Sequence, residues 1–230
     1  MSNTPDLGPV PQRITVDAEQ VRRLVEQQFA QWAGLPVQPV VNGGWDNWTF
    51  HLGAEMLVRL PSAAEYALAV DKEHRWLAAL APQLPLPIPV PLAKGEPGMG
   101  YPYPWSIYQW LSGEPASADR IADPVRFAAD LAGFLTALRS VDPSVIDFGT
   151  CGVGDPACDL AIAWTLLTAD GRQAFREQLS AGEAEWARGR GWALWKTLAT
   201  CAYSLGDDDE QAVSARRVLG EIFSEYAIGR

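Results

Sequence analysis

The residues whose types and spacing most clearly suggest catalysis or metal binding lie in the segment SVIDFGTCGVGDPACDL, residues 144–160. The apolar run before Asp147 predicts a buried strand that ends at this carboxylate, and Gly149 lets the backbone turn directly after it. A buried charge is costly unless it meets a cation or hydrogen-bond donors. A divalent ion shared with phosphate oxygens would meet that need. Asp147 is therefore a candidate magnesium ligand, and a helix-capping or turn aspartate remains an open alternative.

A second candidate is the turn that holds Gly43, Gly44 and Asn47, between two segments with the alternating pattern of strands. Glycines allow a backbone to approach phosphate oxygens closely, and the N–H groups of such a turn favour anions. The alternative is a plain hairpin with glycine at positive φ, which the turn taken alone favours.

A cation and a carboxylate form the third candidate. Arg59 lies between Val58 and Leu60 in the alternating segment MLVRLP, so its side chain points either to solvent or into a binding site. Glu73 follows in a segment of helical period. A strand cation paired with a helix carboxylate can place positive charge on nucleotide phosphates. Taken singly, each residue is more often an ordinary surface charge.

Other polar residues exclude some chemistry. His51 and His74 are the only histidines, which leaves little from which to build a Ser-His-Asp triad or a multi-histidine metal site. Both histidines are expected at the surface. Asp155 precedes Pro156 and an apolar run, as a helix N-cap does, so a structural role is expected first. Most of the ten tryptophans are expected in helix-packed cores.

Composition limits the class of protein. The 230 residues are 48% hydrophobic and 20% charged, as in globular chains, and the formal net charge of −10 argues against nucleic acid and membrane surfaces as partners. Three cysteines without CxxC spacing fit a reducing compartment. The N-terminus lacks the pattern of a signal peptide, and no uncharged apolar run is long enough to span a bilayer. A cytoplasmic protein is expected.

The elements that must position these residues change along the chain. The pattern of the first part predicts a frayed lead-in over 1–14, a helix over 15–32 and strands within 38–61. A helix over 62–80 follows, and after it come a proline-rich extended segment and a strand within 101–111. The second part predicts a helix over 123–140 and, after Asp155, helices broken near Gly171, Gly182 and Gly206. This is an α+β pattern with two lobes, residues 1–110 and 111–230, whose junction would offer a ligand site.

Taken together and in order, these segments make the chain resemble the aminoglycoside phosphotransferase family, the protein-kinase-like enzymes that phosphorylate small-molecule hydroxyls. The macrolide-phosphotransferase-type branch is the most similar. The stretches that carry the resemblance are GGWDNWTFHLG, MLVRLP, KEHRWLAAL, the segment from LPLPIPVPL to WLSGEPA, and VIDFGTCGVGDPACDLAIAW.

The resemblance implies a protein-kinase-like two-lobe fold, with a nucleotide-binding lobe that holds an N-terminal antiparallel sheet with flanking helices, and a mostly helical C-terminal lobe. It implies ATP or GTP with Mg²⁺ as cofactors and a small-molecule hydroxyl as substrate. It also implies roles for individual residues: Gly43, Gly44 and Asn47 cover the phosphates, Arg59 contacts them where many relatives carry lysine, Glu73 orients Arg59, the backbone at Gln109 and Trp110 meets adenine, and Asp147 binds magnesium.

One departure from the family pattern is large. Between the helix that ends near Ser140 and VIDFG, the family has more helix and then a His-Gly-Asp…Asn loop, whose aspartate accepts the substrate proton and whose asparagine holds a second magnesium. Here only VDPS intervenes, no histidine follows His74 and no asparagine follows Asn47. Asp142 is no convincing substitute, because the connector to Asp147 spans at most about 18 Å.

The chain therefore resembles a family member shortened between about residues 140 and 145, with no catalytic residue to assign. Positioning and charge neutralisation are nearly the whole of catalysis in phosphoryl transfer, so the loss should impair it severely. Two interpretations stay open: an impaired phosphotransferase, and a non-catalytic pseudo-enzyme that binds a nucleotide or small molecule. A plain helical interaction protein would leave the Asp-Phe-Gly segment unexplained.

Overall fold

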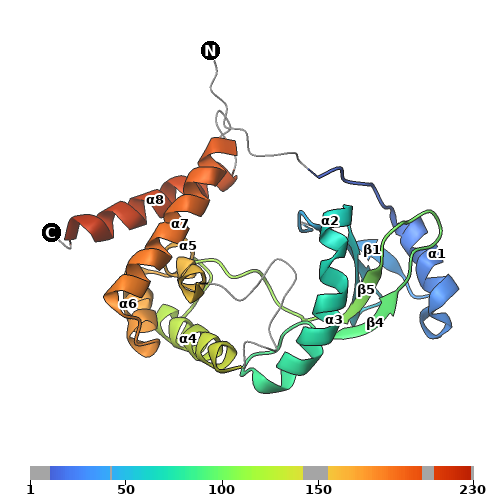
Figure 1. The fold of residues 1–230 in the computed structure, drawn as a ribbon, viewed down its shortest axis with the longest axis horizontal. Helices are drawn as coiled ribbons and strands as arrows, with labels where there is room; N and C mark the ends of the chain where they lie inside the picture. Colours follow the sequence, from blue (N-terminus) through green and yellow to red (C-terminus); the bar gives the residue numbers. More distant parts are fainter. Residues whose placement is uncertain (1–10, 42, 142–154, 204–209, 229–230) are drawn as a thin grey trace, which may run out of the picture. The chain divides into compact units, whose positions relative to one another are not determined.

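The computed structural model describes residues 11–41, 43–141, 155–203 and 210–228. These residues fall into two compact units, and the chain passes from the first to the second between Ser112 and Gly113 (Figure 1). The first unit contains all the strands of the described residues, and the second contains only helices, which is the α+β division expected from the sequence.

A five-stranded antiparallel sheet forms the centre of the first unit, with the strand order β1-β2-β3-β5-β4. The register pairs Thr49 with Arg59 and Arg59 with Ser106, so these three side chains share one face of the sheet. Phe50 and Val58 alternate with them and share the other face. The strands are β1 (Val37–Pro39), β2 (Asn47–Leu52), β3 (Met56–Pro61), β4 (Pro91–Gly95) and β5 (Trp105–Gln109).

Helix α1 (Ala18–Gln28) covers the apolar face of this sheet. Asp17 begins the helix, because its carboxylate accepts a hydrogen bond of 2.7 Å from the N–H of Gln20. The helix is shorter than the sequence pattern predicts: it ends at Gln28, and a 3₁₀ turn (Ala30–Trp32) follows. The core that it closes contains Val21, Leu24, Val25, Phe50, Leu52, Val58, Leu60, Tyr101, Trp105 and Ile107.

Two helices, α2 (Ala64–Ala67) and α3 (Ala69–Leu80), follow β3 directly. In Figure 1, α3 lies on the side of the sheet opposite α1. The polar face of the sheet therefore faces a helix that carries charged residues, and the candidate site is built there.

The structure describes residues 11–14 of the expected lead-in, and Arg13 and Ile14 are anchored to the sheet rather than frayed. The Ile14 N–H donates to the Ser62 carbonyl at 2.8 Å, and the Trp48 indole N–H donates to the Ile14 carbonyl at 2.7 Å. The guanidinium of Arg13 lies 4.7 Å from the ring centroid of Trp45 and 5.1 Å from that of Trp48. The expectation of a loose lead-in was wrong for these residues because the sequence does not show such long-range contacts.

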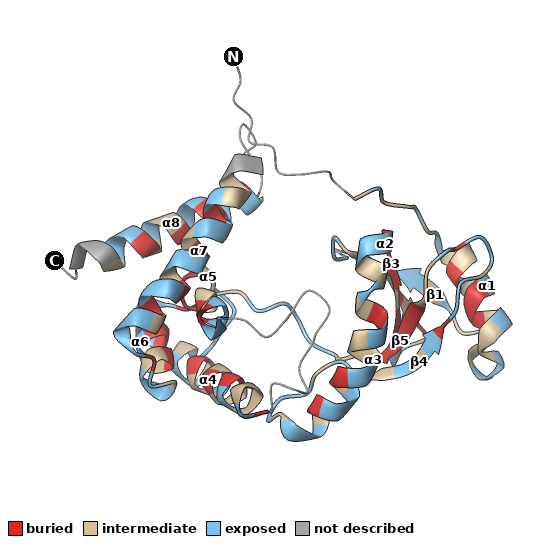
Figure 2. Cartoon of the chain, in the orientation of Figure 1, coloured by how far each residue is buried: buried red, intermediate tan, exposed pale blue. Residues whose placement is uncertain are grey.

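The second unit is a set of packed helices. Its helices are α4 (Pro124–Ser140), α5 (Ile162–Thr165), α6 (Ala169–Gln178), α7 (Glu183–Tyr203) and α8 (Glu210–Ile228), with the 3₁₀ helix η4 (Pro156–Ala161) before α5. Buried residues on α4, α6 and α7 build the core (Figure 2). In the described part of the chain, no helix is both long and apolar enough to cross a membrane.

The breaks between these helices follow from local signals. Thr168 caps α6, so the break precedes Gly171, which lies inside the first turn of the helix. Gly182 directly precedes α7, as expected, and Gly206 lies outside the described residues. Trp164 and Trp186 are buried as predicted. Trp192 and Trp195 are not: their exposed fractions are 41% and 64%, which corrects the expectation that they pack in the core.

Candidate functional site

Arg59 and Glu73 form an ion pair on the polar face of the sheet. Arg59 lies in the middle of β3 and Glu73 in the first half of α3, and Arg59 Nη1 is 3.0 Å from Glu73 Oε2. The side chains are 31% and 19% exposed, so the pair is only partly open to water. The structure thus joins two residues that the sequence separates by 14 positions.

Tyr108 on β5 contacts both members of this pair. Its hydroxyl donates to the same oxygen of Glu73, and the Arg59 guanidinium lies 5.4 Å from the centroid of its ring. Tyr108 is 1% exposed, and burial, together with the adjacent Glu73 charge, raises the pKa of its phenol. Tyr108 therefore stays protonated and acts as a hydrogen-bond donor to the carboxylate.

His74 lies next to this cluster and is not the simple surface residue expected from the sequence. The imidazole is half-buried and shares a hydrogen bond of 3.0 Å between Nε2 and the hydroxyl of buried Ser106. Burial lowers the pKa of His74, and the nearby Lys94 ammonium lowers it further. Lys94 in turn pairs with Asp71 at 2.6 Å. Polar side chains of α3 and of the sheet therefore contact one another through hydrogen bonds and ion pairs in the space between the two.

The loop before β2 holds Gly43 and Gly44, both exposed, and Asn47 begins the strand itself. Neither glycine has a φ in the left-handed region, so the plain alternative of a turn that requires positive φ does not explain them. A Cβ at Gly43 would meet only the Val40 carbonyl oxygen at 3.8 Å, and one at Gly44 would meet nothing within 4 Å. The backbone here is accessible to a ligand, and the packing of the described residues does not itself require glycine.

Gln109 and Trp110 lie where β5 ends. The Gln109 N–H donates to the Val90 carbonyl at 3.0 Å, and the Trp110 N–H donates to the Glu55 carbonyl at 2.8 Å. The Trp110 ring also contacts the His51 imidazole, with 4.3 Å between ring centroids. Both N–H groups are thus used within the unit, and a ligand at these two residues would have to use their carbonyl oxygens or side chains.

The candidate metal ligand, Asp147, lies outside the described residues. Among the residues that the structure describes, no three His, Cys, Asp or Glu side chains gather as for a metal ion. The described residues of the candidate site in the first unit are therefore of types that bind phosphate.

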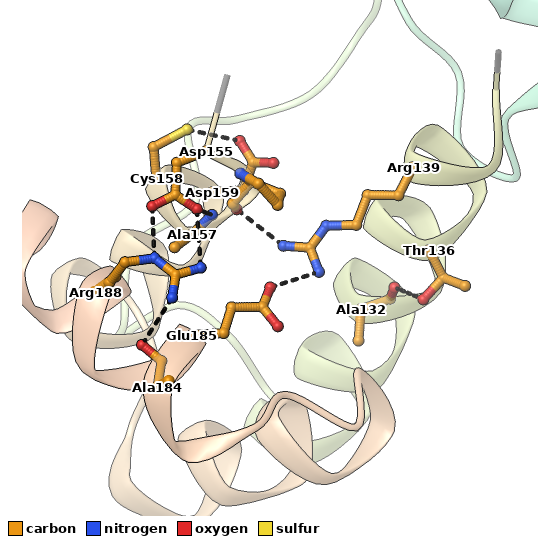
Figure 3. Close-up of polar contacts among 11 residues, drawn as sticks. Ala132, Thr136, Arg139, Asp155, Ala157, Cys158, Asp159, Ala184, Glu185 and Arg188 are labelled. Atoms are coloured by element: carbon orange, nitrogen blue, oxygen red, sulfur yellow. Dashed lines mark hydrogen bonds and ion pairs between the residues drawn. The ribbon is translucent and has the colours of Figure 1, made fainter. Parts of the chain in front are cut away.

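Asp155 has the structural role expected of it in the second unit (Figure 3). Its carboxylate caps η4 by accepting from the Ala157 N–H at 3.1 Å, and it forms an ion pair of 2.7 Å with Arg188 of α7. The Arg188 guanidinium lowers the pKa of this carboxyl. Arg139 adds a second link, since it donates to the Pro156 carbonyl at 2.9 Å and pairs with Glu185 at 3.1 Å. These contacts fix η4 between α4 and α7.

The role of Tyr108 and the contacts of His74 are absent from the predictions made from sequence. The alternation in WSIYQ places Ser106 and Tyr108 on one face, and that signal could have grouped them. It could not have assigned them to Arg59, because that depends on β5 pairing with β3 at one particular register.

Comparison with known proteins gives the same fold. Aminoglycoside 2'-phosphotransferase-IIIa in its GDP complex is similar over 92% of this chain and 100% of that one, with 13% identity and a TM-score of 0.72. The streptomycin–ATP–APH(2'')-IIa ternary complex is similar over 89% and 99%, with 14% identity and a TM-score of 0.59. Macrolide 2'-phosphotransferase type I is similar over 88% and 97%, with 15% identity and a TM-score of 0.54. No curated protein matches the chain.

At such identities these structures show the fold, which is the protein-kinase-like α+β fold that the sequence predicted. The sequence itself matches the model of a family described as the phosphotransferase enzyme family, in two segments, residues 37–145 and 142–192. Together these segments span the sheet, the Arg59–Glu73 pair and the Asp-Phe-Gly segment, which is well over half of the chain. The chain therefore belongs to the phosphotransferase enzyme family.

Proposed function

We propose that the first unit binds ATP or GTP, and that the chain is a phosphotransferase-family protein in which transfer to a small-molecule hydroxyl is impaired. The observation that carries nucleotide binding is the Arg59–Glu73 pair on β3, the strand that pairs with β2, which the exposed glycine loop precedes. One guanidinium N–H bonds Glu73. Arginine carries five N–H donors, so others are available for phosphate oxygens.

The remaining roles follow the layout of the sheet. Gly43, Gly44 and Asn47 would cover the phosphates, because both glycines are exposed and a Cβ added at either would meet nothing closer than 3.8 Å. Gln109 and Trp110 would meet the base through carbonyl oxygens, which accept from an exocyclic amine. We assign Mg²⁺ to Asp147 on the ground of the family motif alone. When bound, Mg²⁺ supplies charge neutralisation on the phosphates.

Impairment rests on what the sequence lacks. Helix α4 ends at Ser140, and only six residues separate it from Asp147. The sequence has no histidine after His74 and no asparagine after Asn47, so it offers no source for the family's catalytic loop. The match to the family model in two segments, rather than one, supports an interruption at this point.

The second candidate function is a non-catalytic module that binds a nucleotide or a small molecule.

The acceptors to test for transfer follow from similar structures. Structures similar to this chain were solved with kanamycin, with gentamicin and with streptomycin plus ATP, so an antibiotic hydroxyl is one acceptor to test. Choline/ethanolamine kinase family protein from Mesorhizobium loti is also similar in fold, with 14% identity and a TM-score of 0.55, so a metabolite hydroxyl is another. We propose the cytoplasm as the compartment, because ATP and GTP are supplied there.

The test separates binding from transfer. Calorimetric titration with Mg-ATP and Mg-GTP should show binding to the wild-type chain, and Arg59→Ala should weaken it about tenfold or more, as expected for loss of a charged hydrogen bond. Arg23→Ala is the matched control, since Arg23 is an exposed arginine on α1 and should leave the affinity unchanged. Absence of binding at millimolar nucleotide, or wild-type affinity in Arg59→Ala, would reject nucleotide binding at this site.

Transfer is measured with radiolabelled nucleotide and three acceptors: kanamycin, a macrolide and choline. We expect at most a trace of product, far below the rate of an intact family member. A trace above the background of the Arg59→Ala variant would favour the impaired phosphotransferase. Turnover at the rate of an intact family member would contradict the impaired state. Binding of nucleotide with no transfer to any acceptor would favour the non-catalytic module.

A further inference from the structure

Two donors converge on one carboxylate oxygen in the candidate site. The Arg59 guanidinium and the Tyr108 hydroxyl both donate to Oε2 of Glu73. Tyr108 is 1% exposed, and its backbone belongs to β5, which pairs with β3 in a fixed register. A buried side chain on a paired strand has little freedom, so the hydroxyl gives Glu73 a rigid reference point that a flexible surface pair would lack.

The ring of Tyr108 acts on Arg59 as well. The guanidinium carbon lies 5.4 Å from the ring centroid, within the range of a cation–π contact. Arg59 is thus held at two points, by the carboxylate of Glu73 and by the ring of Tyr108. Two contacts restrict the position of the guanidinium, and its planar, fork-shaped group can use both and still keep several N–H groups in a fixed plane for a ligand.

We propose that Tyr108 is a positioning residue that holds Glu73 and Arg59 in the geometry in which Arg59 binds nucleotide phosphates, and that it adapts the site to arginine rather than lysine. This inference rests on the proposed nucleotide binding. It assigns a role at that site to Tyr108, a residue to which we assign no contact with the base or the metal. It accounts for arginine at a position where a lysine would present a compact charge without a flat face.

The experiment is a double-mutant cycle on nucleotide affinity. Calorimetry with Mg-ATP, or with Mg-GTP if that binds more tightly, measures the wild type, Tyr108→Phe, Arg59→Ala and the double variant. Tyr108→Phe removes only the hydroxyl and should weaken binding about three- to tenfold. In the Arg59→Ala background the same change should weaken binding less than about twofold, because the group that Tyr108 positions is gone.

Tyr101→Phe is the matched control. Tyr101 is also a buried tyrosine of the first unit, 2% exposed, and its hydroxyl donates to the Pro61 carbonyl at 2.8 Å. Its loss should lower the melting temperature much as Tyr108→Phe does and leave the nucleotide affinity unchanged. A displacement titration with the free nucleoside adds a phosphate-independent readout, which Tyr108→Phe should not alter.

Arg59→Lys tests the same inference without a change in the buried tyrosine, in case Tyr108→Phe does not fold. It keeps the charge and should still weaken Mg-nucleotide binding at least about threefold. Wild-type affinity in Arg59→Lys, equal losses for nucleotide and nucleoside in Tyr108→Phe, or full additivity in the cycle would overturn the role of Tyr108. A wild-type chain that binds no nucleotide, or is indifferent to Arg59→Ala, would overturn the proposed function as well, so the two failures are distinguishable.

Discussion

At the scale of single residues, two cations on the polar face of the sheet pair with carboxylates of α3. Arg59 pairs with Glu73, and Lys94 pairs with Asp71. The formal charge of the whole chain, −10, opposes the approach of an anionic nucleotide. Binding must therefore depend on a few local donors that are already oriented, since long-range attraction does not help. An arginine fixed by two neighbours meets this requirement better than a mobile cation, because its ordering cost is met during folding.

At this scale we predict how His74 changes the pH dependence of protein stability. Its folded-state pKa lies below 6.5, because burial and Lys94 outweigh the opposing charges of Asp71 and Glu73. As pH falls through 6.5, the unfolded chain takes up a proton that the folded chain binds less well, so this residue makes stability fall. His74→Gln should therefore show a smaller drop in melting temperature between pH 7.5 and pH 5.5 than the wild type. Equal drops in calorimetric scans would contradict the depressed pKa.

At the scale of elements, the sequence predicts well those features that local periodicity determines. The alternation around Arg59 predicted β3, and the helical spacing around Glu73 predicted α3. Contacts across strands are different, because register is set by the whole sheet and not by any one segment. The placement of Tyr108 beside Arg59 depends on the register of β5 against β3, and the anchoring of Arg13 on Trp45 depends on a long-range contact outside the strands, so neither was found from sequence. The resemblance to the family supplied Arg59 and Glu73 as a pair, where residue types alone left each of them an ordinary surface charge.

The contact between α7 and η4 gives a prediction for an element. Gly189 is buried in α7, and a Cβ there would lie 2.6 Å from Leu160 Cβ and 3.1 Å from the Ala157 carbonyl oxygen of η4. Gly189→Ala should therefore destabilise the second unit by about 1–3 kcal/mol, measured by urea unfolding. Gly191→Ala, two residues along the same helix, meets nothing within 4 Å and should stabilise by about 0.5–1 kcal/mol. Equal effects of the two substitutions would refute this close approach.

At the scale of the whole molecule, the described residues form two hydrophobic cores that share no member. One is closed by α1 on the sheet and contains Leu24, and the other lies among α4 to α8 and contains Leu160. Each core buries large side chains within its own unit, among them Trp105 in the first and Trp164 in the second. A unit with its own core can in principle unfold by itself. The proposed nucleotide contacts of the described residues all lie in the first unit, so a ligand should stabilise the two units unequally.

This inequality can be measured by scanning calorimetry on a matched pair of variants. Leu24→Ala and Leu160→Ala each remove a fully buried leucine side chain, at a cost of about 2–5 kcal/mol to the unit that holds it. We expect two unfolding transitions, of which each variant lowers one. Mg-ATP or Mg-GTP, whichever binds, should raise the transition that Leu24→Ala lowers, because a ligand stabilises the folded state to which it binds. A single transition that both variants lower equally would mean that the two cores unfold as one cooperative structure, and a nucleotide that raised the Leu160-sensitive transition instead would place its binding site outside the first unit.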